Sequence, residues 1–316
     1  MNAPLPKVIL FTSPKAGSGA GRDQLPRLRE QLTRAGFPFF ETATADELKT
    51  LVCSDLESSP SPIVVTAGGD GTLSLAASLL PSSVPLCPMP MGTENLLARL
   101  IGQSNRAEDV VQTLRSGFRC AIDAGEANGR LFLIMATIGF DAEVVRAVHL
   151  RRQGHISRLA YALPAARLFG RYTYPSLKIQ TYDSAGQETT LVDAGWAMLF
   201  NLPCYAAGLR IQPKTDADDG KLDAVFLTRK GRIAALRYLT AIGIQRHQQL
   251  ADVQQDLVHS VRVDCDQRIA YQLDGDYVGK TPVEIKTLRK RVTILFPPDA
   301  GDRVFDSIGV TKRASQ

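Results

Sequence analysis

Cysteine is scarce in this sequence, and its spacing excludes two common ways of stabilising a fold. The 316 residues include five cysteines, and no two of them form a C-x-x-C pair. An odd and dispersed set argues against a disulfide framework and against a zinc site. It fits a protein that works in a reducing compartment.

Long apolar runs are also missing. The longest, residues 131–138, has the length of a strand and falls well short of the ~18 residues that indicate a membrane span. The N-terminus has neither the charged start nor the apolar core of a signal peptide. We therefore expect a soluble cytoplasmic protein.

A strong excess of one charge is lacking as well. The 37 basic and 32 acidic residues leave a net charge of +5, which is too small and too dispersed to predict nucleic-acid binding. A local basic cluster is either a solvated helix face or a patch that faces a membrane or an acidic ligand. Its members are Arg146, Arg151, Arg152, Arg158, Arg167 and Arg171.

Strand and helix patterns alternate in the first third of the chain. The expected strands are residues 8–11, 37–42, 63–67 and 84–89, and the expected helices are 25–35, 45–56, 72–80 and 92–99. This alternation predicts an α/β domain with a largely parallel sheet. Ligands bind such sheets at the carboxyl ends of the strands, where the glycine-rich turns gather.

Strand patterns dominate from about residue 119. The expected strands are 118–124, 130–137, 177–182, 194–200, 221–228, 261–265, 270–273 and 291–296, with helices at 141–150, 156–169 and 232–250. They predict a mainly antiparallel β-sandwich. The length suggests two domains, which we place at 1–120 and 121–297, with residues 298–316 able to form a helix and pack back on the first.

The most informative segment is Gly68-Gly69-Asp70-Gly71-Thr72, which follows a buried strand and precedes a helix. The glycines allow a ligand close to the backbone, and the N-terminus of the following helix favours an anion. The Asp70 carboxylate repels phosphate unless a cation lies between them. A nucleotide with a divalent metal satisfies these features, and a simple helix cap at Asp70 is the alternative.

Three further turns carry polar side chains. Residues 92–99 begin with Gly92-Thr93-Glu94-Asn95 and predict a second glycine-led helix start, or ordinary capping by Thr93. The acidic turn 216–223 is either a site for a hard metal or a solvated β-turn. Asp274-Gly275-Asp276 supplies either a general base or a hairpin turn. Neither a dinucleotide G-x-G-x-x-G fingerprint nor a Walker A loop fits the glycine spacings at 17–22 and 275–281.

In this order, the motifs resemble the diacylglycerol kinase catalytic family, which includes sphingosine and ceramide kinases. Six segments carry the resemblance across nearly the whole chain: 13–19, 68–72, 92–99, 138–142, 219–223 and 274–276. The Gly68–Thr72 motif alone is shared with NAD kinases and phosphofructokinases, whereas the series is more specific.

The resemblance implies ATP and Mg²⁺ as cofactors and a membrane-derived lipid as acceptor. The ATP residues implied are Pro14, Lys15, Gly17, Thr42, Gly68, Gly69, Asp70, Gly71, Thr72, Leu73, Ser74, Leu75, Thr93 and Asn95. Asp70 would reach magnesium through water. Asp219, with the backbone carbonyls of Asp216 and Lys221, would bind a metal, and Asp274 or Asp276 would take the proton from the acceptor hydroxyl.

Three positions depart from the family pattern: Ser13 replaces Asn, Leu96 stands where Asp is usual, and Asp276 replaces Glu. The rival interpretations are a kinase acting on NAD and a catalytically silent nucleotide- or lipid-binding module. For a lipid kinase we expect transient contact with a membrane surface. No residue pattern distinguishes diacylglycerol from a sphingoid base or indicates an oligomeric state.

Overall fold

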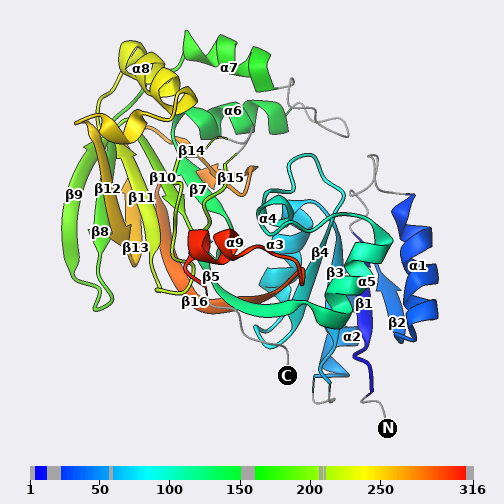
Figure 1. Ribbon diagram of the computed structural model, residues 1–316. Coiled ribbons are helices and arrows are strands. Elements are labelled where there is room, and N and C mark those ends of the chain that lie inside the picture. The colour runs from blue at the N-terminus through cyan, green and yellow to red at the C-terminus, as the bar shows by residue number, and fades with distance from the viewer. Residues whose placement is uncertain are drawn as a thin grey trace. The chain divides into compact units, whose positions relative to one another are not determined.

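The structure, a computed structural model, describes residues 4–12, 23–56, 60–150, 161–205, 209 and 211–310. The chain divides into two units, Met1–Ile122 with Lys290–Gln316, and Asp123–Arg289 (Figure 1). It passes from the first unit to the second within β5 (Phe118–Ala127) and returns within β16 (Val283–Phe296). The chain re-enters the first unit before residue 297, because the end of β16 pairs with a strand of that unit: Thr293 lies opposite Pro85 of β4 (Pro85–Pro90).

The first unit is a parallel sheet with helices on its faces (Figure 1). Its strand order is β2-β1-β3-β4-β16, and the register of β1 on β3 pairs Val8 with Ile63. The elements are β1 (Val8–Thr12), α1 (Gln24–Ala35), β2 (Phe39–Thr42), α2 (Ala45–Cys53), β3 (Ile63–Gly68), α3 (Asp70–Leu79), β4 (Pro85–Pro90), α4 (Leu96–Leu100), α5 (Ala107–Ser116) and α9 (Asp302–Ile308).

Apolar burial explains this arrangement. The side chains of β3 are buried throughout, as expected for a strand covered on both faces. Leu28 and Leu32 of α1 join Val110 and Leu114 of α5 in one core cluster over the sheet. Helix α1 ends at Gly36, whose φ of 80° is the left-handed conformation that glycine adopts without strain.

The second unit is antiparallel. A six-stranded sheet has the order β12-β11-β10-β7-β14-β15, and the strands β13, β8 and β9 extend from the first half of β16. The elements are β6 (Arg130–Phe132), β7 (Met135–Ile138), α6 (Phe140–His149), α7 (Ala162–Phe169), β8 (Leu177–Tyr182), β9 (Glu188–Ala194), β10 (Trp196–Phe200), β11 (Leu222–Leu227), α8 (Arg232–Gly243), the 3₁₀ turn η3 (His247–Gln249), β12 (Val253–Val258), β13 (Ser260–Asp264), β14 (Ala270–Leu273) and β15 (Asp276–Lys280).

The predicted fold class is confirmed: a parallel α/β part is followed by an antiparallel β part. Several element predictions need correction. The helix expected at 92–99 begins only at Leu96, the strand expected at 130–137 is split into β6 and β7, and the helix expected at 232–250 ends at Gly243. The strands β9, β12 and β15, residues 283–290 of β16 and the helix α5 were not predicted. The predicted helix at 156–169 is described only from residue 161 onwards.

The tail after Pro297-Pro298 forms α9, as predicted. Phe305 of α9 packs on Phe296 and on Phe118, with ring centroids 5.3 and 6.2 Å apart, so this helix lies on the first unit. In the described parts of the chain, no helix is both long enough and apolar enough to cross a membrane.

Candidate active site

Two glycine-led turns of the first unit meet at the carboxyl ends of β3 and β4. A Cβ atom added to Gly92 would lie 2.6 Å from the Cα of Gly69, closer than carbon atoms approach without bonding. A Cβ added to Gly68 would lie 2.2 Å from the Thr72 hydroxyl oxygen. The glycines are therefore required here by close packing, and they bring the start of α3 against the turn before α4.

Asp70, the first residue of α3, connects these two turns. Its carboxylate accepts the backbone N–H of Leu96 at 2.9 Å and that of Leu97 at 3.3 Å, so it caps the N-terminus of α4. Asn95 adopts a left-handed conformation with φ 49°, and its side chain bonds both the N–H and the carbonyl of Gly92.

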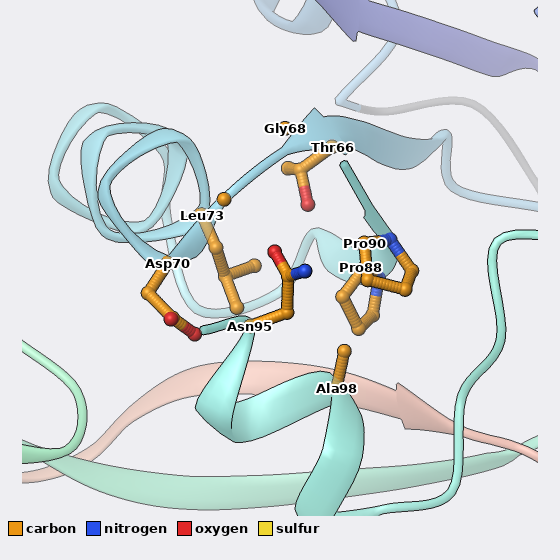
Figure 2. Close-up of a pocket in the computed structure, with 9 residues that line it drawn as sticks. Thr66, Gly68, Asp70, Leu73, Pro88, Pro90, Asn95 and Ala98 are labelled. Atoms are coloured by element: carbon orange, nitrogen blue, oxygen red, sulfur yellow. The ribbon is translucent and has the colours of Figure 1, made fainter. Parts of the chain in front are cut away.

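A small pocket opens at this junction (Figure 2). Thr66, Asn95 and the prolines Pro88 and Pro90 line it, together with the glycine turn. The buried hydroxyl of Thr66 has no hydrogen-bond partner among the described residues, and Figure 2 shows it on the pocket side. A buried unsatisfied hydroxyl is costly, so a polar ligand or water in this pocket would stabilise it.

The other residues predicted to bind ATP differ in accessibility. Thr72 and Leu73 are buried, Ser74 and Thr93 are half-buried, and Gly71 and Leu75 are exposed. The hydroxyl of buried Thr42 donates to Glu47 at 2.7 Å. The side chain of Leu73 nevertheless lines the pocket at the glycine turn, so it can contact a ligand there (Figure 2). The predicted ATP residues Pro14, Lys15 and Gly17 lie outside the described residues.

In the second unit, the acidic turn is held by a carboxylate that the sequence motifs did not include. Asp123, fully buried in β5, accepts the backbone N–H of Gly220 at 2.7 Å. Gly220 has φ 77°, and Asp219 accepts the N–H of Lys221 at 2.8 Å. Asp216 accepts the N–H of Asp218 at 3.0 Å. These bonds fix the backbone between the three predicted metal residues.

Burial gives the acidic turn its electrostatic character. It raises the pKa of Asp219 above the usual value, as does the neighbouring charge of Asp216. Burial also raises the pKa of Asp223 to about 6. No three Asp, Glu, His or Cys side chains converge as metal ligands within the described ranges. A carboxylate with backbone carbonyls is the hard-oxygen donor set that Mg²⁺ or Ca²⁺ takes, and a cation would offset the cost of burying Asp219.

The two candidate bases are in different surroundings. Asp274, with φ 49°, accepts the backbone N–H groups of Leu133 and Ile134 at 2.8 Å and of Met135 at 3.0 Å. These three bonds fix the bend that splits the predicted strand at 130–137 into β6 and β7. Asp276 is exposed at the start of β15. Asp274 thus holds the backbone of this bend in place, and Asp276 is the more accessible carboxylate.

A buried polar chain supports the Asp274–Asp276 turn. Gln272 accepts the Gly275 N–H at 2.7 Å and donates to the Thr137 hydroxyl at 2.9 Å. Thr137 in turn donates to Asp141. Burial raises the pKa of Asp141, against the effect of this bond and of donation from Trp196 at 2.6 Å and Tyr205 at 3.0 Å.

Motif matching missed Asp123, Gln272 and Asn201. Asn201, only 1% exposed, donates to the carbonyls of Asp123 and Leu133 at 2.8 and 2.7 Å, so it ties the acidic turn to the bend held by Asp274. A signal was present for Asp123, because a single carboxylate stands inside the apolar pattern 120–124. Asn201 and Gln272 also follow or interrupt buried strand patterns.

Two protein-family models match the chain in succession. The diacylglycerol kinase catalytic domain matches residues 7–127, and the YegS C-terminal NAD kinase beta sandwich-like domain matches residues 135–296. Their boundaries place the glycine turns in the first match and the acidic and Asp274 turns in the second.

Individual proteins give the same result. The diacylglycerol kinase of Mycobacterium tuberculosis H37Rv is 28% identical over 304 residues, covering 92% of this chain and 95% of its own. That of Staphylococcus carnosus is 24% identical with the same coverages. A solved structure of a putative diacylglycerol kinase from Bacillus anthracis aligns with a TM-score of 0.69 at 22% identity, covering 95% of this chain and 100% of its own. That structure supports the fold.

Proposed function

Because the chain belongs to the diacylglycerol kinase catalytic family, we propose that it transfers the γ-phosphate of ATP to a lipid hydroxyl with the help of Mg²⁺. The observation that carries the proposal is the ordered series of motifs, in which the described turns at 68–72, 216–223 and 274–276 are each held by close contacts or hydrogen bonds of their own. Diacylglycerol, the substrate in the names of the relatives, is the first acceptor to test.

In this proposal the first unit binds ATP. The start of α3 offers backbone N–H groups and the positive end of a helix dipole to the phosphates. The close approach of Gly69 and Gly92 keeps side chains away from that backbone. Asp70 would hold the metal of the nucleotide through water, and its bonds to Leu96 and Leu97 keep its carboxylate in place.

The second unit would supply the metal turn and the base. Asp219, with the carbonyls of Asp216 and Lys221, is the proposed metal set. For the base we choose Asp276 over Asp274, because a carboxylate that already accepts three backbone N–H bonds would lose at least one of them on taking a proton.

The proposed reaction is a single displacement. Asp276 accepts the proton of the lipid hydroxyl as its oxygen bonds to the γ-phosphorus, and the bond from that phosphorus to the β,γ-bridging oxygen breaks to release ADP. Catalysis of this kind rests on positioning and on neutralising phosphate charge. The chain of Gln272, Thr137 and Asp141 contributes to positioning the turn that carries Asp276.

The acceptor class is tested by offering two acceptors side by side. Purified protein is incubated with γ-labelled ATP and Mg²⁺, and either detergent-dispersed lipid extract or NAD. The proposal predicts label in the organic phase, dependent on Mg²⁺, with a product identified by mass. Label in NADP, or in neither acceptor, would overturn it in favour of an NAD kinase or a silent binding module.

A further inference from the structure

Helix α8 presents an apolar face to solvent. Ile233, Leu236, Leu239 and Ile244, which follows the helix, are 87, 57, 37 and 61% exposed. Ile233, Leu236 and Leu239 are spaced by three residues, so they form one stripe along the helix. Several large aliphatic side chains on one exposed face are unusual for a soluble protein and mark an interaction surface.

The opposite face of α8 anchors the helix. Ala234, Ala235, Tyr238, Ala241 and Ile242 are buried against the second unit. Asp252 accepts two bonds from the Arg237 guanidinium at 2.6 and 2.7 Å and a third from the Tyr238 hydroxyl at 2.8 Å. The apolar stripe is thus exposed on a helix whose other side is already packed.

Basic residues surround the stripe. Residues 229–251 contain Arg229, Lys230, Arg232, Arg237 and Arg246 and no Asp or Glu. Arg229 and Arg237 pair with Asp252, and Lys230 with Asp193, while Arg232 and Arg246 are exposed. Arg232 and Arg237 both lie on the solvent side of α8, beside the apolar stripe.

Helix α7 lies at the same end of the second unit as α8 (Figure 1). Burial raises the pKa of Tyr174, and the nearby charge of Arg232, at the start of α8, opposes this effect. The Tyr174 hydroxyl donates to the carbonyl of Phe169 at the end of α7. Figure 1 shows α7 (green) and α8 (yellow) at the same end of the second unit. Leu163 of α7 is 56% exposed.

We propose that α8 docks the protein on an anionic lipid bilayer, with Ile233, Leu236 and Ile244 in the headgroup region and Arg232 and Arg246 on lipid phosphates. An apolar stripe flanked by basic residues is the pattern of a helix that lies in the membrane interface. A second copy of this chain is a poor occupant, because two such basic faces repel each other. This inference rests on the proposed function, because a lipid kinase must reach an acceptor that resides in the bilayer.

Vesicle co-sedimentation without ATP tests this surface. The full chain is mixed with vesicles of phosphatidylcholine containing phosphatidylglycerol, and with vesicles of phosphatidylcholine alone. We expect binding to the anionic vesicles that weakens as salt is raised. Replacing Ile233 and Leu236 together by Ser should weaken it about tenfold or more. The pair Arg232→Gln and Arg246→Gln should weaken it by roughly fivefold per residue.

The matched control replaces Leu191 and Leu257 by Ser. These leucines are 67 and 51% exposed on β9 and β12 of the same unit, and the control should bind vesicles like the unchanged protein. All variants should keep the melting temperature, because surface changes of this kind alter stability little.

Three results would overturn the docking proposal. They are unchanged vesicle binding by the Ile233/Leu236 variant, no vesicle binding by the unchanged protein, and a dimer that this variant dissociates in the absence of vesicle binding. Kinase assays on detergent-dispersed lipid separate docking from catalysis. A docking variant should keep activity in detergent and lose it on vesicles, whereas vesicle binding without kinase activity in detergent contradicts only the proposed reaction.

Discussion

The contact between Gly69 and Gly92 sets a steric limit at the residue scale. Gly92→Ala would place a Cβ 2.6 Å from the Gly69 Cα, so the backbone of one turn must move. We expect a loss of roughly 1–3 kcal/mol in the free energy of unfolding, as for overpacking elsewhere, together with weaker ATP binding. Urea denaturation and nucleotide titration measure the two effects.

Gly243→Ala is the control for this change. Gly243 ends α8 in an ordinary backbone conformation, and beyond its chain neighbours and its own helix backbone no atom lies within 4 Å of its added Cβ. This variant should be neutral or slightly stabilised, because alanine restricts the unfolded chain. If Gly92→Ala had the same stability and ATP affinity as Gly243→Ala, the close approach of the two turns would be required neither for folding nor for ATP binding.

Replacing each candidate base by its amide should have different effects on turnover and on stability. Asp276→Asn should remove most of the turnover and leave the melting temperature unchanged, since the residue is exposed. Asp274→Asn should lower stability by about 1–3 kcal/mol, because an amide nitrogen would face backbone N–H donors. Thermal melts and turnover rates are compared for both. Full turnover in Asp276→Asn would assign the base to Asp274 or elsewhere.

Residue roles could be predicted from the sequence only where a motif carries them. The glycine turn at 68–72 stands out because glycine, a carboxylate and a strand end occur together. The partners of its carboxylate do not stand out, because Asp70 binds backbone N–H groups 26 and 27 residues away. Asp274 likewise reaches across 139 to 141 residues. Every residue except proline has a backbone N–H group, so the sequence does not reveal which of these groups a carboxylate will bind.

At the scale of elements, the attachment of α8 predicts a pH dependence. The Arg237 guanidinium lowers the pKa of Asp252 from the usual 3.8 to about 2. A carboxyl group with a lowered folded-state pKa stabilises the protein above its unfolded pKa, and this stability is lost as the pH falls from about 4 to about 2. Asp252→Asn should therefore cost roughly 1–2 kcal/mol at neutral pH.

Urea denaturation at several pH values measures this difference. The gap in stability between the unchanged protein and Asp252→Asn should narrow on acidification through that range. Asp256→Asn, an exposed change on β12, should show no such gap. A gap for Asp252→Asn that stays constant down to about pH 2 would contradict the ion-pair account.

The three strands that the sequence prediction missed entirely share a position in the fold. Strands β9, β12 and β15 each lie at the edge of a sheet. The first four residues of β9 are exposed, and four of the six in β12 are exposed as well. An edge strand needs no buried face and so lacks the apolar alternation on which prediction depends. Central strands such as β3 and β10 were predicted because they are buried.

Helix boundaries failed for a different reason. Residues 92–95 form a turn closed by the Asn95 side chain, so the predicted helix starts one turn late. Beyond Gly243, Gln245 adopts φ 56°, which ends α8 before the periodic pattern does. In both places, a single polar residue, Asn95 or Gln245, adopts a left-handed backbone conformation that sets the helix boundary.

At the scale of the whole molecule, the proposed metal should stabilise the fold. A ligand that binds only the folded state adds about 2.7 kcal/mol when its concentration is a hundred times its dissociation constant. Mg²⁺ in excess should therefore raise the melting temperature of the unchanged protein. Asp219→Asn should remove this increase and Asp256→Asn should keep it. An equal increase in both variants would place the metal outside the 216–221 turn.

The central claim is that the Gly68–Thr72 turn serves phosphate transfer from ATP to a lipid, and one measurement tests it most directly. Label from γ-labelled ATP is counted in the organic phase for the unchanged protein and for Asp70→Asn, which keeps one oxygen to cap α4. The account predicts a labelled lipid and a loss of about a hundredfold or more in the variant, with a loss of stability of no more than about 1–3 kcal/mol, because the amide nitrogen would face one backbone N–H group. Equal labelling by the two proteins would contradict it.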